Sequence, residues 1–234
     1  MRTMNLVFPV QNDECRLIRG IRRTTDFCNE YFPGRYRITI EDCGSADGTE
    51  RLGRSLAACC PHVEYIRTDK STALSEALRA NTCDVIGFLG IDLSGGLEHL
   101  LFADQMFENN AVGAINGSRY RRLSIIRVQR TLWKAARRFR AVWKLLFRVS
   151  TDDPLCHFKL FRRETAEQLV PFCGNFSCWT ACSELTLRAE RSGVLVRELT
   201  VDWMEPTFDP SLFRSQRVLL WRETIRLWLH LHSH

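Results

Sequence analysis

Short apolar runs alternate with helix-like segments through the first half of the chain, and this alternation restricts the possible folds more than any other feature. Runs typical of buried strands occur at 5–10, 36–41, 63–67, 84–91 and 111–117. Helical patterns lie between them, at 14–31, 47–60, 72–82 and 95–108. Because strands and helices that alternate at this spacing form right-handed crossovers, the sequence predicts an α/β fold, with a mostly parallel sheet and helices on both faces.

Polar side chains follow three of these predicted strands. They are Gln11, Asn12, Asp13 and Glu14 after the first strand, Asp42 after the second, and Asp92 after the strand at 84–91. Any one of them is explained by a helix cap or a turn. However, the carboxyl ends of parallel strands meet at one edge of the sheet, where such folds bind their ligands. Three converging strand ends therefore favour a binding site.

The sequence lacks two common phosphate-binding motifs, and this restricts the kind of ligand. Neither G-x-G-x-x-G nor G-x-x-x-x-G-K-[ST] occurs, so a glycine loop that cradles phosphate is not expected. Acids at a sheet edge instead suit hydroxyl and amide donors of a nucleoside, together with a divalent metal, Mg²⁺ or Mn²⁺, that bridges a diphosphate. A nucleotide diphosphate meets both requirements.

Composition and cysteine usage indicate the compartment. The 234 residues are 45% hydrophobic, enough for one domain with a substantial core. Ten cysteines include an adjacent pair and no C-x-x-C spacing, which favours a reducing cytoplasm. The first apolar run is too short for a signal peptide, and no run approaches the 18 apolar residues of a membrane span. We therefore expect a cytoplasmic protein.

Residues 117–149 carry the positive charge of the chain, with eleven Arg and Lys and no acid. Because the net charge of the whole chain is +6, the other residues together carry −5. Apolar residues recur in this segment at steps of three and four: Ile125, Val128, Leu132, Ala135, Phe139, Val142 and Leu146. This pattern predicts a basic amphipathic helix, flanked by Trp133 and Trp143, that lies on the anionic inner face of a membrane. Packing of the same face onto the protein is the alternative reading.

Two further observations concern the charged helices. The segment 211–231 has similar character and predicts a second basic helix, whose final His-Leu-His-Ser-His is read either as a metal ligand set or as a frayed end. Nucleic acid is the competing anionic partner. Since no nucleic-acid-binding motif occurs and the strand-end acids repel a polyanion, a nucleic-acid-binding module is the less favoured reading.

Five stretches, taken in order and spacing, resemble one enzyme family. They are FPVQND at 8–13, EDCGSADGT at 41–49, FLGIDLSGGLEHL at 88–100, GSRY at 117–120 and DPLCHFKLFRRETAEQL at 153–169. Together they are similar to the family 2 glycosyltransferases with the GT-A fold, and within that family to the polyprenyl-phosphate sugar transferases, such as dolichyl-phosphate mannose and glucose synthases. The resemblance covers nearly the whole chain. It implies a single GT-A domain over 1–234, with a nucleotide-binding half at 1–117 and an acceptor- and membrane-facing half at 118–234.

The resemblance also implies roles for individual residues. Binding of the nucleotide-sugar donor is expected from Pro9, Gln11, Asp13, Asp42, Gly90, Ile91, Asp92 and Arg119. Asp92 is also the expected ligand of the divalent metal and, with Glu184, an expected catalytic residue. An acceptor phosphate, carried by a polyprenyl lipid or a similar molecule, is expected to contact Arg127 and Lys159.

The chain departs from the family pattern at several polar positions. Gly90 stands for the first acid of D-x-D, Cys43 for the second acid of D-D-G-S, Gln11 for an aromatic residue, Cys182 for an aspartate, and Leu212 for a lysine. These replacements keep open the reading of a nucleotide-sugar-binding protein with weak or no transferase activity. A phosphate acceptor, ionised at neutral pH, needs no strong general base, whereas a hydroxyl acceptor does. Glu184 is the matched candidate for that base, or else a helix carboxylate paired with Arg188.

Overall fold

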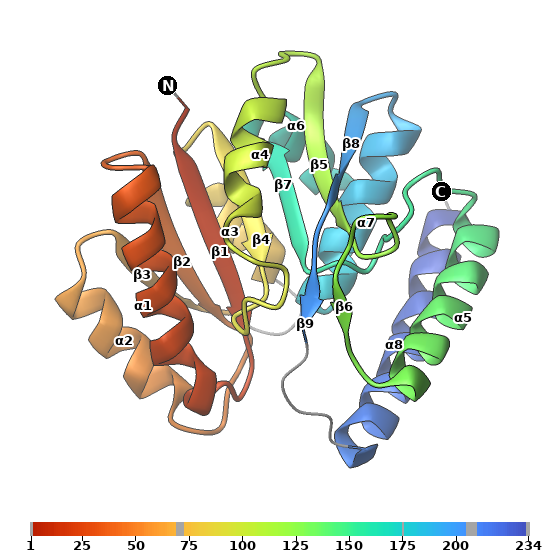
Figure 1. The fold of residues 1–234 in the computed structure, drawn as a ribbon, viewed down its shortest axis with the longest axis horizontal. Helices are drawn as coiled ribbons and strands as arrows, with labels where there is room; N and C mark the ends of the chain where they lie inside the picture. The colour runs from red at the N-terminus through yellow and green to blue at the C-terminus, as the bar shows by residue number, and fades with distance from the viewer. Residues whose placement is uncertain (1, 69–72, 175, 205–209, 233–234) are drawn as a thin grey trace.

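The computed structural model describes residues 2–68, 73–174, 176–204 and 210–232, with side chains described outside 73–75, 178 and 210–217. The elements are β1 (Met4–Val10), α1 (Glu14–Tyr31), β2 (Tyr36–Asp42), α2 (Thr49–Cys59), β3 (Val63–Arg67), α3 (Ala73–Arg79), β4 (Val85–Leu89), α4 (His99–Met106), β5 (Val112–Ser118), β6 (Ile126–Arg127), α5 (Arg130–Phe147), β7 (Phe158–Arg162), α6 (Arg163–Leu169), a 3₁₀ turn (Val170–Phe172), α7 (Cys178–Arg191), β8 (Leu195–Thr200), β9 (Trp203–Met204) and α8 (Pro210–His232) (Figure 1).

The main sheet has seven strands in the order β3-β2-β1-β4-β7-β5-β8. Every pairing is parallel except those of β7, which runs antiparallel to β4 and to β5. Strands β6 and β9 form a separate two-stranded ribbon. These pairings confirm the mostly parallel sheet predicted from the sequence. β1 is buried along its full length, as expected for a strand in a sheet that helices cover on both faces.

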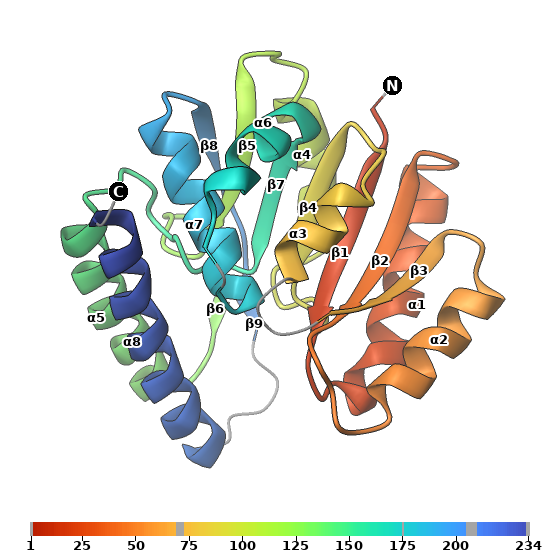
Figure 2. The same ribbon diagram turned by 180° about the vertical axis from the view of Figure 1, so that it is seen from behind.

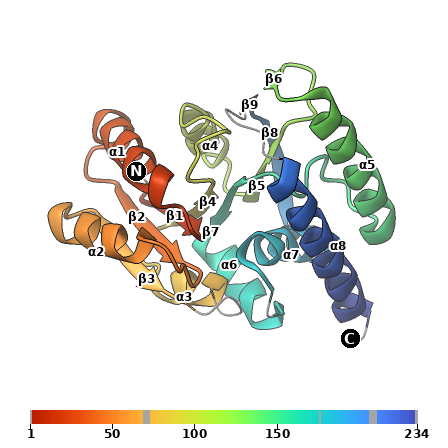
Figure 3. The same ribbon diagram turned by 90° about the horizontal axis from the view of Figure 1, so that it is seen from below.

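Helices cover both faces of the sheet, and two more stand beside it. Figure 1 shows α1, α2 and α4 on one face, and Figure 2 shows α3, α6 and α7 on the other. Phe8 of β1 packs with Leu17 of α1 in the first core. Phe88 of β4, Leu185 of α7 and Leu227 of α8 belong to the second. Seen from below, α5 and α8 lie side by side beyond α7, at the β8 end of the molecule (Figure 3).

The predicted basic helix is shorter than its charge pattern indicates. Residues 117–129 of that segment include the end of β5, a loop and β6, and the helix α5 begins only at Arg130. Ile125 and Val128 are therefore not on its apolar face, which corrects the prediction. The physical reason is a competing partner: Ile125 donates its N–H to Asp202, and its carbonyl accepts from Trp203. The helix predicted at 211–231 is confirmed as α8, and the last two residues of the predicted metal-binding tail, 233 and 234, lie outside the described part.

Two sequence expectations concern the chain as a whole. Within the described residues, no helix is both long and apolar enough to span a lipid bilayer. The nine cysteines whose side chains are described are all free thiols, and several of them, such as Cys28 and Cys182, are buried in the two cores.

Candidate functional site

The loops that follow β1, β2 and β4 lie at one edge of the sheet, as the sequence predicts. The parallel register pairs Val10 with Asp42, so the loops after β1 and β2 leave the sheet at the same level. Helix α1 approaches the third loop closely: a Cβ on Gly20 would lie 2.5 Å from the carbonyl oxygen of Ile91. Only glycine permits this contact, which holds the loop after β4 beside the other two.

Hydrogen bonds join the first two loops into one unit. The backbone N–H of Asn12 donates to Ser45 Oγ (3.0 Å), and Ala46 N–H donates back to Asn12 Oδ1 (2.8 Å). Asp13 N–H donates to Thr49 Oγ1 (2.9 Å). Asn12 has a positive φ of 57°, a conformation that costs free energy in a non-glycine residue and that these bonds maintain. The unit is therefore organised before any ligand binds.

Asp42 has an internal role in this unit. Its carboxylate is fully buried, with Oδ1 accepting from Ser45 N–H (2.8 Å) and Oδ2 accepting from the Tyr65 hydroxyl (2.6 Å). Desolvation, followed by the charge and hydrogen bond of Asp42, raises the pKa of Tyr65. Both oxygens of Asp42 are thus occupied by the protein, and its predicted contact with a nucleoside stays a prediction.

The other predicted donor residues of β1 differ in accessibility. Pro9 is buried within β1, and Asp13 is 8% exposed, with Gln11 N–H donating to its Oδ2 (3.0 Å) and Arg16 forming an ion pair with it. Gln11 is exposed, and its side-chain amide donates to the carbonyl of Cys43 (3.2 Å). Of this group, Gln11 offers the most accessible polar surface.

The loop after β4 presents Asp92 to solvent. Ile91 is buried, whereas Asp92 is exposed, and one oxygen of Asp92 accepts from Ser94 N–H (3.2 Å). The next residue, Leu93, has a positive φ of 55°. Gly90 supplies no carboxylate, so the D-x-D position holds a single acid. This acid fits a divalent cation as a monodentate ligand, with diphosphate oxygens and water needed to complete the shell.

Arg119 is held rigidly beyond the end of β5 by Asp153. Its Nε lies 2.6 Å from Asp153 Oδ2, its Nη2 lies 2.9 Å from Oδ1, and its backbone N–H donates to Oδ2 (3.0 Å). The guanidinium also lies 4.4 Å from the ring centre of Trp203. Burial opposes its charge, but Asp153 outweighs that cost and raises the pKa of Arg119. No hydrogen bond to Nη1 occurs within the described residues, so this nitrogen is available to an anion.

His157 and Trp179 form an aromatic stack beside this arginine. Their rings lie 3.9 Å apart at 18°, and the His157 carbonyl accepts from Gly90 N–H (3.1 Å). His157 is exposed to solvent. Desolvation by the neighbouring groups, followed by the positive charge of Arg119, lowers the pKa of His157. The ring is therefore neutral at neutral pH.

Lys159 and Arg127, the predicted acceptor-phosphate residues, lie in different environments. Lys159 is 1% exposed in the middle of β7, where its Nζ donates to Asn116 Oδ1, and burial lowers the pKa of its ammonium group. The buried Lys159 is engaged by Asn116, and its contact with an acceptor phosphate stays a prediction. Arg127 is exposed on β6 and keeps its candidate role.

Glu184, the predicted catalytic carboxylate, is also enclosed by the protein. It is fully buried on α7, where Oε1 accepts from Arg188 (2.8 Å) and Oε2 accepts from Gly174 N–H (2.9 Å). His230 of α8 lies 3.4 Å from the same carboxylate. A base must reach the proton it removes. The catalytic role of Glu184 stays a prediction, and the alternative pairing with Arg188 is present.

The arrangement of the sheet is shared with solved glycosyltransferase structures. Glucosyl-3-phosphoglycerate synthase from Mycobacterium tuberculosis, in complex with UDP, superposes with a TM-score of 0.68 at 17% identity, over 97% of this chain and 79% of that one. A mannosyltransferase from Pyrobaculum calidifontis, in complex with GDP-mannose and Mn²⁺, gives a TM-score of 0.62 at 17% identity, over 96% and 64% of the two chains.

The chain has the GT-A fold. Sequence relatives of this GT-A domain are glycosyltransferases, in agreement with the predicted resemblance. They include the glycosyltransferase AglD from Haloferax volcanii, 24% identical over 97% of this chain, and a dolichyl-phosphate beta-glucosyltransferase from Dictyostelium discoideum, 25% identical over 86%. The chain spans 37% of the length of the first relative and 66% of the second. No protein-family model matches the chain.

Several residues that build this GT-A site were not singled out from the sequence. They are Asp153, His157, Trp179 and Trp203. Asp153 and His157 occur in the stretch 153–169 that carries the family resemblance, so their segment was recognised although their roles were not. Trp179 and Trp203 gave no usable signal, because an aromatic residue in a helix or at a strand end is more often part of a core.

Proposed function

We propose that this GT-A domain transfers a sugar from a nucleotide-diphosphate sugar to a phosphate acceptor. The observation that carries the proposal is the sequence match to a glycosyltransferase along 97% of the chain. The rigid loops after β1 and β2, the exposed Asp92 and the fixed Arg119 support it, since they lie at the ligand-binding edge of the fold. Residues 1–117 form the donor half of this proposal, and residues 118–234 the acceptor half.

The charge on the leaving nucleotide diphosphate sets the chemical requirement. Transfer of the sugar leaves negative charge on the diphosphate, which cations must stabilise. Asp92 holds a divalent cation in this proposal, and the bound cation acts as a Lewis acid on the phosphate oxygens. Arg119 contributes a preoriented guanidinium, because Asp153 fixes its direction and leaves Nη1 for a phosphate oxygen. Mn²⁺ accompanies the donors in solved structures of the two neighbours.

A phosphate monoester is the acceptor that best suits the chain. Its second pKa is about 6, so it is ionised at neutral pH and attacks without a strong base. The enclosed carboxylate of Glu184 and the replacement at Cys182 are compatible with such an acceptor and not with an alcohol that needs a base. The name of the Dictyostelium relative points to a lipid phosphate, and Arg127 on β6 offers an exposed cation.

Exposed side chains of α5 and α8 support a position on the inner face of an anionic membrane. Exposed cations of these two helices without an acidic partner among the described residues are Arg130, Lys134, Arg137 and Arg138 of α5 and Arg222 of α8. Exposed apolar side chains are Val142 and Leu145 of α5 and Val218, Leu219, Ile225, Trp228 and Leu229 of α8. Trp143, however, is 1% exposed and packs on Phe147, so it belongs to the core and not to the lipid contact. The proposed contact rests on the remaining side chains.

A donor-binding protein without transferase activity is the second candidate, favoured by Gly90 and by the enclosed Glu184. Thermal shifts with UDP- and GDP-sugars, each with and without Mn²⁺, test donor binding. At one hundred times the dissociation constant the ligand adds about 2.7 kcal/mol of stability. We expect the sugars of one nucleotide to raise Tm. The rise in Tm that nucleotide and metal produce together should be smaller in Asp92→Asn and in Arg119→Gln. His62→Gln, on a remote exposed loop, serves as the control.

Transfer itself is measured by incubating the responding donor, radiolabelled in the sugar, with a polyprenyl phosphate in vesicles. Labelled lipid indicates transfer. A thermal shift without labelled lipid or labelled soluble phosphate product supports the binding protein. No shift with any nucleotide contradicts both candidates.

A further inference from the structure

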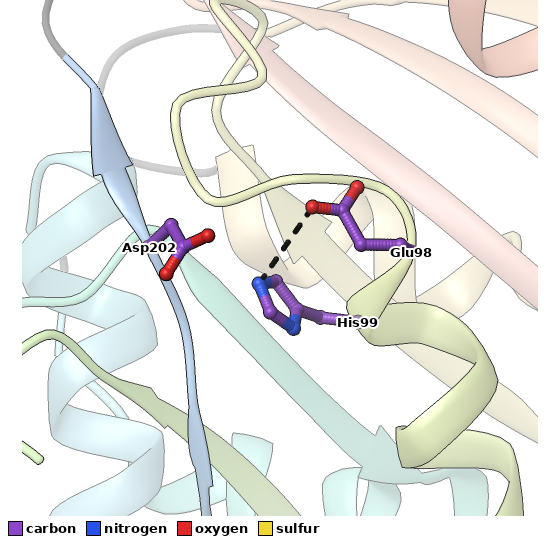
Figure 4. Close-up of side chains that lie close together, drawn as sticks. All are labelled: Glu98, His99 and Asp202. Carbon is purple, nitrogen blue, oxygen red and sulfur yellow. Dashed lines mark ion pairs between the residues drawn. The ribbon is translucent and has the colours of Figure 1, made fainter. Parts of the chain in front are cut away.

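Three metal-ligating side chains that are distant in the sequence meet outside the Asp92 position. They are Glu98 and His99, at the start of α4, and Asp202, between β8 and β9. One ligand atom from each lies within 4.8 Å of the other two, and Figure 4 shows the three side chains converging. Asp92 does not belong to this group.

His99 supplies a buried nitrogen without a hydrogen-bond partner. Its side chain is 13% exposed, and its Nε2 is shielded from solvent with no hydrogen bond in the described part of the chain. The ring is fixed edge-on against Phe158, at 6.2 Å and 90°. Because buried polar atoms are nearly always satisfied, an orphaned imidazole nitrogen that faces two carboxylates points to an absent ligand.

The two carboxylates retain oxygens for that ligand. Glu98 Oε1 lies 4.0 Å from His99 Nε2, and the carboxylate rests against Gly96, where a Cβ would lie only 2.4 Å from it. Asp202 uses Oδ1 to accept from Ile125 N–H (2.8 Å), which orients the group and leaves its other oxygen. The donor set is thus one nitrogen and two carboxylate oxygens from fixed elements.

We propose that Glu98, His99 and Asp202 bind a transition-metal dication, for which Mn²⁺ is a suitable species. A mixed set of imidazole and carboxylates is typical of such ions. Two ligand atoms that bind one metal at about 2.1 Å and at right angles lie about 3 Å apart. The three ligand atoms, now within 4.8 Å of one another, must therefore move closer together when the metal binds. Glu98 provides this movement, because 61% of its side chain is exposed. The competing explanation is a protonated His99 paired with the two carboxylates and no metal.

A cation at this site connects the start of α4 with the turn between β8 and β9. Glu98 and His99 directly follow the loop that contains Asp92, and Asp202 precedes Trp203, which packs on Arg119. The same segments already touch, since Met204 N–H donates to the Ser94 carbonyl (3.4 Å). Metal binding is therefore expected to fix the loop that carries Asp92. The inference goes beyond the proposed function, because it needs no nucleotide and no transfer reaction.

The test is Mn²⁺ binding to the whole chain, followed by electron paramagnetic resonance of the free ion, with no nucleotide present. Mn²⁺ is used because the free cysteines compete for softer metals such as Zn²⁺. We expect one Mn²⁺ per wild-type chain and at least tenfold weaker binding in His99→Gln and in Asp202→Asn. The amide oxygen introduced by Asp202→Asn still accepts from Ile125 N–H, so this second variant keeps the local fold. Asp92→Asn and the control His62→Gln should bind like the wild type.

Three results overturn the proposal. They are a wild type that binds no Mn²⁺, variants at His99 and Asp202 that bind it unchanged, and a loss of binding confined to Asp92→Asn. The last result places the ion at Asp92 instead. Since nucleotide binding is measured separately, the metal site and the proposed function fail independently.

Discussion

Replacement of Asp153 by Asn tests whether its ion pair with Arg119 organises the site. The two side chains are 2% and 14% exposed, so the substitution leaves a guanidinium largely buried without a counter-charge. Removal of one partner from a buried pair costs about 3–5 kcal/mol. In a domain of this length each kcal/mol lowers Tm by roughly 2–4 °C, so we expect a decrease of about 6–20 °C.

The free energy of unfolding is measured by urea denaturation and Tm by calorimetry. Arg37→Gln is the matched control, because the Arg37–Glu64 pair is 36% and 44% exposed and should contribute at most about 1 kcal/mol. The double variant Arg119→Gln with Asp153→Asn removes both charges. It should therefore be more stable than Asp153→Asn alone, which a double-mutant cycle quantifies.

The same substitution has a functional consequence. Because Asp153 directs the guanidinium, Asp153→Asn should also weaken the thermal response to the nucleotide, although Asp153 need not touch the ligand. A loss of less than about 1 kcal/mol in stability, equal to that of Arg37→Gln, would refute the argument that burial makes this ion pair strong.

Two further predictions concern the outer helices and the thiols. Replacing Arg130, Arg137 and Arg138 by Gln should weaken binding to phosphatidylserine vesicles, measured by sedimentation, by about 1 kcal/mol per cation at low salt. Trp143→Ala should instead lower Tm. Equal sedimentation of the Gln variant and the wild type would contradict the membrane contact. Burial raises the pKa of Cys28 and of Cys156 to about 12, so both stay protonated in the folded state, whereas unfolded thiols ionise near pH 9. The stability that the two thiols contribute is complete below pH 9 and decreases as the pH rises toward 12. The urea midpoint of Cys28→Ser should therefore depend less on pH than that of the wild type between pH 8 and 10.5. Parallel curves for the two proteins would count against this assignment.

The regular part of the fold was determined by the sequence because its signals are local. Apolar periodicity located the five strands from β1 to β5 and the four helices between them to within a few residues. The strand-end acids are local signals too, since the carboxyl ends of parallel strands must share an edge. The position of Asp92 in the loop after β4 followed from the same reasoning, whereas Arg119, directly after β5, was singled out by the family resemblance alone.

The surroundings of each polar side chain were decided only by the tertiary structure. Glu184 and Lys159 occupy family positions, yet burial by α7, α8 and the sheet turns both inward. Trp143 was read as a lipid contact because helical periodicity gives a face without naming what covers it, and the packing of α5 against α8 put it in the core. His99 and Asp202 are about 100 residues apart. Their meeting depends on how α4 packs beside β8, a contact between distant segments that no local pattern contains.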